Sequence, residues 1–304
     1  MSEPGSSHIR FPRSGHILIP AEGRRAVAAG LSLHSSCRPA AVLAQRILYA
    51  GARVVGPRVV PGERARWTPP LPEEVWSGLL EEWTSHVGRV DSVAVYHRPQ
   101  TGRVGLSALL LREGRGVGFV RVSNDVARVN HEARVVRALN RARPETFRVA
   151  ELVAAEDVNG LGWMLSESVP NYPLGAVRRS RTREAVAAEI SDVLSDALDR
   201  PADVPPHWTV AHGDLSPWNL RRRISGAVQV IDWEDAAYAP PGVDALYGAL
   251  TAHVSLGTPL PVSAPAEAHA WVDDLLSGRI ATQPDAAAEI TRTRDVLRAI
   301  PVAR

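Results

Sequence analysis

Two short motifs near residue 220 carry the side chains best suited to chemistry. The first is HGDLSPWN, residues 212–219, and the second is IDWE, residues 231–234. The segment between them has two short runs joined at Ser225-Gly226, and a two-residue turn that ends in Gly is a strong hairpin signal. With that turn, Asn219 is expected directly opposite Asp232, and such cross-strand neighbours have Cβ atoms about 4.5–5.5 Å apart. An amide oxygen and a carboxylate at that separation can hold one Mg²⁺ between them.

The order of these residues is that of a phosphoryl-transfer site. A loop Asp five positions before a metal-binding Asn, with a second Asp after a hairpin, is the layout of kinase catalytic and metal loops. Asp214, Asn219 and Asp232 have this order and spacing. Each residue alone could be a turn cap, a strand-edge polar residue or a loop residue. The order of the three residues, their spacing and the predicted hairpin pairing all agree, however. This agreement favours the interpretation that the three residues form one phosphoryl-transfer site.

The motif HGDLSPWN followed by IDWED resembles the motifs of the aminoglycoside phosphotransferase and choline kinase family more closely than those of protein kinases. The resemblance implies that Asp214 is the catalytic base, which accepts the proton of the substrate hydroxyl. It also implies that Asn219 and Asp232 hold the metal ions that bridge the nucleotide phosphates. His212 would brace the loop, and Asp244 would accept hydrogen bonds from its backbone. For Asp244 an N-cap of the following helix is an equal alternative.

Short β-rich runs begin near residue 90, at residues 92–96, 103–111 and 117–122, and look like the antiparallel sheet of a kinase N-lobe. Residues 114–118, GRGVG, imitate a dinucleotide fingerprint, but that motif needs a helix after it and here a strand follows. A hairpin turn is the better interpretation. The loop that covers the phosphates is then expected at residues 99–102, which are not Gly-rich.

A helix is predicted over residues 126–141, with one of residues 123–125 as its cap. Glu132 falls inside the apolar stripe of this helix, and a carboxylate that faces a core is costly unless it is paired. In the family, the third strand supplies a Lys that contacts nucleotide phosphates and pairs with a helix Glu. Arg121 stands at that position, so we expect it to pair with Glu132. The alternative is that both residues lie on solvated edges.

Residues 161–170 resemble the hinge between kinase lobes, whose backbone binds adenine, and this implies nucleotide contacts at Glu167 and Val169. Two further helices are predicted at residues 264–276 and 286–300. In the family such C-terminal helices build the acceptor pocket.

The acceptor itself is not readable from the sequence. Aminoglycoside kinases need an acidic pocket, to which Asp273-Asp274 could contribute, although two adjacent acids on a helix are more often a solvated face. The Arg-rich segment 178–183 instead favours an anionic or neutral acceptor.

Composition indicates an ordinary globular protein. The formal net charge of the 304 residues is only +2, so no strong field for nucleic acid is expected, and all 35 basic residues are Arg. Cys37 is the only cysteine, which excludes an intrachain disulfide and favours a reducing cytoplasm. No stretch has the length and apolarity of a membrane span, and the start of the chain lacks the apolar core of a signal peptide.

The first 86 residues lie outside the recognisable pattern. A helix is expected near residues 38–52, because Ala40, Leu43, Ile47 and Ala50 recur at helical spacing. Residues 68–72, TPPLP, have the composition of a linker.

The sequence therefore predicts an α+β, two-lobe, protein-kinase-like fold with an antiparallel-sheet N-lobe, a mostly helical C-lobe and a helical N-terminal extension. The expected boundaries are 1–86 for the extension, 87–170 for the N-lobe and hinge, and 171–304 for the C-lobe. The expected reaction is ATP- and Mg²⁺-dependent phosphoryl transfer to a hydroxyl group of a small molecule, with no nucleic-acid or membrane partner. The alternative is a pseudokinase that binds a nucleotide or a partner without transfer. A protein kinase is disfavoured, because the eleven residues between Asp232 and Asp244 are too few for a peptide-binding segment.

Overall fold

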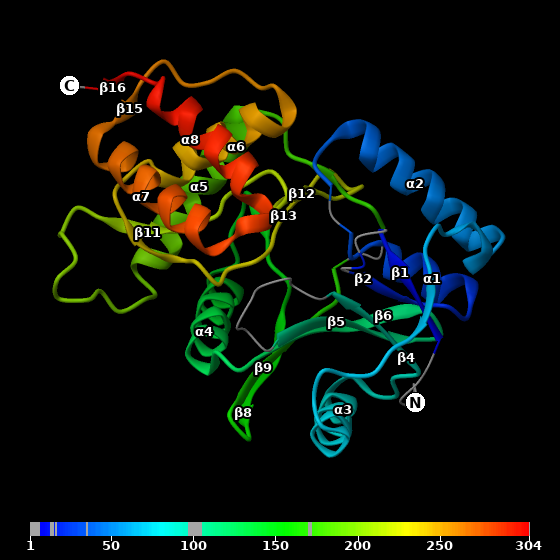
Figure 1. Ribbon diagram of the computed structural model, residues 1–304. Helices are drawn as coiled ribbons and strands as arrows, with labels where there is room; N and C mark the ends of the chain where they lie inside the picture. Colours follow the sequence, from blue (N-terminus) through cyan, green and yellow to red (C-terminus); the bar gives the residue numbers. More distant parts are fainter. Residues whose placement is uncertain are drawn as a thin grey trace. The chain divides into compact units, whose positions relative to one another are not determined.

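The computed structural model describes residues 7–12, 15, 17–34, 36–96, 105–169 and 172–303 (Figure 1). Contacts between Cα atoms divide the chain into two compact units. Unit 1 comprises Met1–Ala133 and Ala150–Leu174, and unit 2 comprises Arg134–Val149 and Gly175–Arg304. The loop expected at residues 99–102 lies outside the described residues. The boundaries at residues 86 and 170 stay a prediction.

Unit 1 is built on an eight-stranded sheet in which every neighbouring pair is antiparallel. The strand order is β3-β1-β2-β4-β5-β6-β9-β8. The strands are β1 Ser7–Phe11, β2 Ile17–Pro20, β3 Arg64–Arg66, β4 Ser92–Tyr96, β5 Gly105–Arg112, β6 Arg115–Ser123, β8 Leu152–Val158 and β9 Leu161–Ser166.

The turn between β5 and β6 settles the interpretation of the GRGVG segment. Glu113 and Gly114 both have positive φ, 52° and 70°, which is the backbone of a two-residue hairpin turn of type I′. A strand and not a helix follows Gly114, since β6 begins at Arg115 and contains Gly116 and Gly118. The predicted hairpin is confirmed.

The N-terminal residues contribute strands as well as helices, and the helices are α1 (Arg24–Leu31), α2 (Pro39–Val54), η1 (Pro57–Val59) and α3 (Glu73–Val87). Of these, only α2 was predicted from the sequence. Strands β1, β2 and β3 extend the sheet of unit 1, because β2 pairs with β4 through Ile17 and Tyr96. The sequence did not predict these strands.

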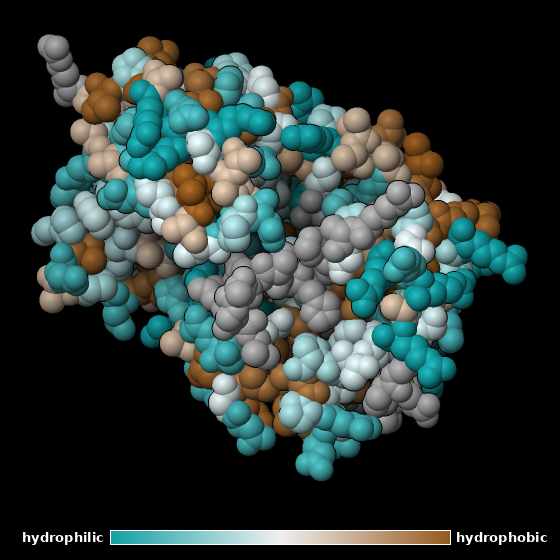
Figure 2. Space-filling view, in the orientation of Figure 1, coloured by the Kyte–Doolittle hydropathy of each residue, from teal (hydrophilic) through white to brown (hydrophobic). Residues whose placement is uncertain are grey.

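Helix α2 confirms the helix predicted near residues 38–52, but its apolar stripe faces outward. Leu43 and Ile47 are 60% and 66% exposed, and hydrophobic side chains gather over α2 in Figure 2. The buried face instead carries Val42 and Gln45, whose amide nitrogen donates to the carbonyl oxygens of Leu31 and His34 at 2.7 and 2.6 Å. The period of the pattern thus predicts the helix correctly, while burial follows a different face.

The core of unit 1 is dominated by tryptophan. Trp67, Trp76, Trp83 and Trp163 form a series of edge-to-face contacts with ring centroids 5.1, 5.6 and 6.4 Å apart. Such contacts are the favoured geometry for aromatic pairs. They fasten α3 to the sheet, because Trp163 belongs to β9.

Unit 2 is mostly helical, with α5 (Ser180–Ser195), α6 (Val243–Leu256), α7 (Ala266–Thr282), η2 (Pro284–Ala286) and α8 (Ala287–Arg298). Helix α4, Val126–Ala142, runs from unit 1 into unit 2. The small sheet β10-β12-β13-β7 joins Gly175–Ala176, Leu220–Arg222, Val228–Val230 and Phe147–Arg148. Two further pairs are β11 (Thr209–Ala211) with β14 (Ala237–Ala239), and β15 (Ala264–Pro265) with β16 (Val302–Ala303). The predicted α+β class, with an antiparallel-sheet part and a mostly helical part, is confirmed.

No helix in the described parts of the chain is long and apolar enough to cross a membrane.

Candidate active site

The HGD loop follows strand β11 and leads into β12, so both ends of the loop are held by sheet hydrogen bonds. Gly213 has a φ of +78°, and a Cβ at this position would lie 2.3 Å from the carbonyl oxygen of Asp235. Only glycine meets both conditions without strain. Helix α6 also approaches closely at Gly248, where a Cβ would lie 2.8 Å from the carbonyl oxygen of Leu215. Small residues therefore let two segments pack directly against the loop.

Asp244 holds the backbone of this loop from α6. Its carboxylate accepts the N–H groups of His212 and Gly213 at 2.7 and 3.1 Å, and the residue is only 5% exposed. The N-cap alternative is wrong, because α6 begins at Val243 and Gly242 occupies the cap position. Burial raises the pKa of the Asp244 carboxyl, while nearby His212 and the two backbone N–H groups oppose that rise.

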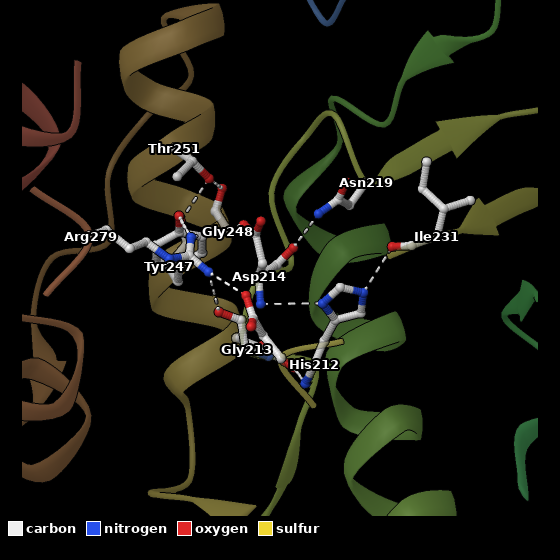
Figure 3. Close-up of polar contacts among 11 residues, drawn as sticks. His212, Gly213, Asp214, Asn219, Ile231, Tyr247, Gly248, Thr251 and Arg279 are labelled. Atoms are coloured by element: carbon white, nitrogen blue, oxygen red, sulfur yellow. Dashed lines mark hydrogen bonds and ion pairs between the residues drawn. The ribbon is translucent and has the colours of Figure 1, made fainter. Parts of the chain in front are cut away.

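The His212 ring connects the loop to the end of β13 (Figure 3). Its Nε2 lies 3.1 Å from the carbonyl oxygen of Ile231, and its Nδ1 accepts the backbone N–H of Asp214 at 3.2 Å. These partners assign the proton to Nε2. The ring also packs 4.5 Å from the Trp233 ring. His212 therefore braces the loop through both ring nitrogens, as the resemblance implies.

The hairpin after Asn219 exists, but its predicted register is wrong by one residue. Leu220 pairs with Val230, and Gly226 closes a three-residue loop at a φ of +89°. Asn219 therefore lies opposite Ile231, whose N–H donates to the Asn219 carbonyl oxygen at 3.1 Å.

Asp232 lies beyond the paired strands, where the chain turns through a φ of +68°. Asp is one of the few residues that adopt this conformation, which concentrates at functional sites. The direct cross-strand pairing of Asn219 with Asp232 is thus contradicted, and the metal assignment loses the support of the register.

Asn219 and Asp232 nevertheless both lie near Asp214. The Asn219 amide nitrogen donates to the Asp214 carbonyl oxygen at 3.0 Å, and Asn219 is 4% exposed. The amide oxygen of Asn219 is not used in that bond. The charge of Asp232 is close enough to raise the pKa of Asp214. Oxygen donors of these types suit Mg²⁺. Among the described residues, no group of three or more His, Cys, Asp or Glu side chains forms an all-protein metal centre.

Arg279 is a member of the site that the sequence did not predict. It comes from α7, and its Nη1 lies 3.4 Å from Asp214 Oδ1 while its Nη2 lies 2.9 Å from Asp235 Oδ2. Nη1 also donates to the Tyr247 hydroxyl of α6 (Figure 3). Only 13% of the Arg279 side chain is exposed. Arg279 thus links the proposed base to the helices that follow it.

Burial dominates the electrostatics of Asp214. Removal from water raises the pKa of the Asp214 carboxyl, as do the like charges of Asp232 and Asp235, whereas Arg279 and His212 lower it. Burial also disfavours the charged form of Arg279, but its neighbours Tyr247, Asp214 and Asp235 raise its pKa above the ordinary value. Arg279 therefore stays charged and stabilises Asp214 as a carboxylate.

The expected ion pair of unit 1 is present. Arg121 Nη1 lies 2.6 Å from Glu132 Oε2, and the side chains are 13% and 8% exposed. Glu132 lies on the buried face of α4 with the apolar residues Val129, Val136 and Leu139. The alternative of two solvated residues is wrong.

At the end of β9, the Glu167 N–H donates to the Glu151 carbonyl oxygen at 2.8 Å. The hinge assignment of Glu167 and Val169 therefore depends on their other backbone groups and stays a prediction.

One family model matches the chain, over residues 171–263, and its description is "Phosphotransferase enzyme family". Over these residues the chain is similar to the phosphotransferase enzyme family. The predicted family and class of enzyme are thereby confirmed over a phosphotransferase segment that contains the HGD loop, Asn219, Asp232 and Asp244. Arg121 and Arg279 lie outside that segment.

A comparison with curated proteins finds no match. Solved structures similar to the chain include aminoglycoside phosphotransferase APH(4)-Ia, as a thermostable mutant with ADP and hygromycin B. Its TM-score is 0.47 at 12% identity, over 73% of this chain and 98% of that one. The GDP complex of wild-type aminoglycoside 2′-phosphotransferase-IIIa has a TM-score of 0.46 at 13% identity, over 75% of this chain and 99% of that one.

Proposed function

We propose that the protein is an ATP- and Mg²⁺-dependent O-phosphotransferase that acts on a hydroxyl group of a small molecule. The observation that carries this proposal is Asp214, a partly buried carboxylate in a loop braced by His212 and Asp244 within the phosphotransferase segment. Positioning and electrostatic stabilisation supply most of the catalysis in phosphoryl transfer. A rigid loop that presents one carboxylate is suited to that task.

In this proposal Asp214 accepts the proton of the acceptor hydroxyl as its oxygen attacks the γ-phosphorus and ADP leaves. Asn219 and Asp232 would hold Mg²⁺, which when bound offsets the charge of the phosphate oxygens. Arg279 opposes the rise in the pKa of the Asp214 carboxyl that burial causes, and it orients the carboxylate. His212 and Asp244 fix the backbone on either side of Asp214.

The test is ATP consumption across a panel of sugars, aminoglycosides, nucleosides and amino alcohols, together with calorimetric titration of Mg–ATP. Binding with acceptor-dependent turnover supports the proposal. Binding without turnover across the panel supports the pseudokinase, which the Arg at position 121 favours. Absence of Mg–ATP binding contradicts both functions.

Replacement of Asp232 by Ala is expected to weaken Mg–ATP binding at least about tenfold, which is about 1.4 kcal/mol. The triphosphate charge is then less well offset, because a carboxylate ligand is lost. Calorimetry gives the dissociation constant directly. Asp274→Ala, an exposed acid on α7, is the matched control and should leave it unchanged. Equal constants in the wild type and in Asp232→Ala would remove Asp232 from the metal site.

A separate prediction concerns the effect of the Arg121–Glu132 ion pair on activity. If Arg121 contacts nucleotide phosphates, Arg121→Ala should lose far more activity than Arg121→Lys, which keeps a charge but not the planar fork. Glu132→Ala should also lower activity, because it frees the guanidinium that it now binds at 2.6 Å. Steady-state kinetics on the three variants and a double-mutant cycle measure the coupling. In a pseudokinase none of these changes affects turnover, since there is none.

A further inference from the structure

The Arg279 side chain lies in an acidic cluster that includes the proposed base. The cluster comprises Asp214 and Asp235, and the Arg279 guanidinium lies 3.4 Å from one carboxylate and 2.9 Å from the other. The same guanidinium donates to the Tyr247 hydroxyl and lies over the Tyr247 ring, 5.2 Å from its centroid. Arg279 is thus held by Asp214, Asp235 and Tyr247 together, and Figure 3 shows its contacts with Asp214 and Tyr247.

The position is also enforced by the packing of α7. Arg279 follows Ala268, Val272 and Leu276 at intervals of four, four and three residues, and these three side chains are at most 1% exposed. Arg279 therefore projects from the buried face of the helix, and it cannot swing into solvent without a change in that face.

An acceptor that carries ammonium groups needs free carboxylates near its reacting hydroxyl. The single positive charge of Arg279 offsets one of the two negative charges of Asp214 and Asp235, and the guanidinium holds both carboxylates from inside the protein. Of the two further acids considered for such a pocket, Asp273 is bound by Arg294 at 2.7 and 2.9 Å, and Asp274 is exposed on α7. An ammonium group brought to this cluster would also face the guanidinium, and like charges held close together in a partly buried site repel strongly.

We propose that Arg279 determines the class of acceptor: by holding Asp214 and Asp235, it excludes polycationic amino sugars and selects hydroxyl compounds without ammonium groups next to the reacting oxygen. The proposal rests on the proposed function and deepens it. Arg279 acts through Asp214 as a positioning residue and through its own charge as a specificity residue. Because it lies beyond residue 263, the family match carries no information about it.

The experiment compares the affinity of kanamycin, a polycationic amino sugar, for the wild type and for Arg279→Ala, by calorimetry in the presence of Mg–ATP. Loss of the guanidinium removes the positive charge beside two carboxylates and leaves a space. We expect Arg279→Ala to bind kanamycin at least about tenfold more tightly than the wild type. The gained affinity should fall as salt is added, because it is electrostatic.

Three variants make the result specific. Arg279→Lys keeps the charge and should bind kanamycin as weakly as the wild type. Arg279→Gln, which removes the charge but keeps a hydrogen-bond donor, carries the test if Arg279→Ala does not fold. Arg294→Ala removes the neighbouring exposed ion pair with Asp273 and should change nothing.

Kanamycin affinity within twofold of the wild type in both uncharged variants overturns the proposal, and so does tight binding by the wild type. A purely structural role for Arg279 would lower the melting temperature without a gain of affinity, which also overturns it. Failure of the proposed function is a separate result, since the same titrations show whether Mg–ATP binds to the wild type. The affinities of the wild type and the variants for kanamycin can still be compared if Mg–ATP does not bind.

Discussion

Replacement of Asp214 by Asn is expected to lower kcat by about 10²–10⁴-fold, with little change in the dissociation constant of Mg–ATP. The amide has nearly the shape of the carboxylate but cannot accept a proton from the acceptor. The surrounding contacts survive, because the loop is held through the backbone N–H of Asp214 and its carbonyl oxygen. A loss confined to kcat is the signature of an interaction made in the transition state.

The matched control is Asp235→Asn, which removes the same charge from the same guanidinium without touching the proposed base. Asp235 lies 2.9 Å from Arg279, closer than Asp214 does. We expect this variant to keep kcat within about tenfold of the wild type, because it disturbs only the electrostatics of the base. Equal losses in the two variants would show that turnover depends on cluster charge, and the base assignment would be wrong. Retained turnover in Asp214→Asn would have the same meaning.

Glu132 and Arg279 show what a sequence pattern can and cannot predict. Both are charged residues on the apolar stripe of a helix, and both are paired in the structure. The sequence predicts the partner of Glu132 because the family resemblance places Arg121 on the preceding strand. Arg279 carried the same signal, a charge in line with Val272 and Leu276. Its acidic partners, Asp214 and Asp235, however, lie 65 and 44 residues earlier in the chain, and no local pattern connects them.

The hairpin register shows a second limit. Ser225 and Gly226 fit a two-residue turn, but they also fit the last two positions of a three-residue loop. Gly at positive φ satisfies both, so the residue types do not distinguish them. The structure takes the longer loop, and one residue of difference moves Asp232 out of the paired strands. The residue that lies opposite Asn219 therefore depends on the length of the loop.

The strands before residue 87 were missed for a different reason. Strand β2 has only four residues, and all of them are buried, so it shows no alternation of polar and apolar side chains. A short buried strand cannot be told from other apolar segments by period alone. Its pairing with β4 spans about eighty residues of sequence, and such long-range pairing is decided by the rest of the sheet.

Replacement of Asp244 by Ala is expected to lower the free energy of unfolding by about 2–5 kcal/mol, and to lower kcat as well. The variant leaves the N–H groups of His212 and Gly213 without their acceptor, and each unsatisfied buried group costs about 1–3 kcal/mol. Activity should fall because these two residues directly precede Asp214. Urea denaturation measures the first effect, and kcat at a temperature well below the transition measures the second.

Two controls separate the contribution of these hydrogen bonds from that of a negative charge at a helix start. Asp244→Asn keeps one oxygen acceptor and should lose less stability than Asp244→Ala. Glu267→Ala removes an acid from the first turn of α7, but that side chain is 57% exposed, so we expect a change within about 0.5 kcal/mol. If Asp244→Ala cost no more than Glu267→Ala, the loop would not depend on the carboxylate. A fall in kcat without a loss of stability would instead show that Asp244 positions Asp214 while the fold tolerates its absence.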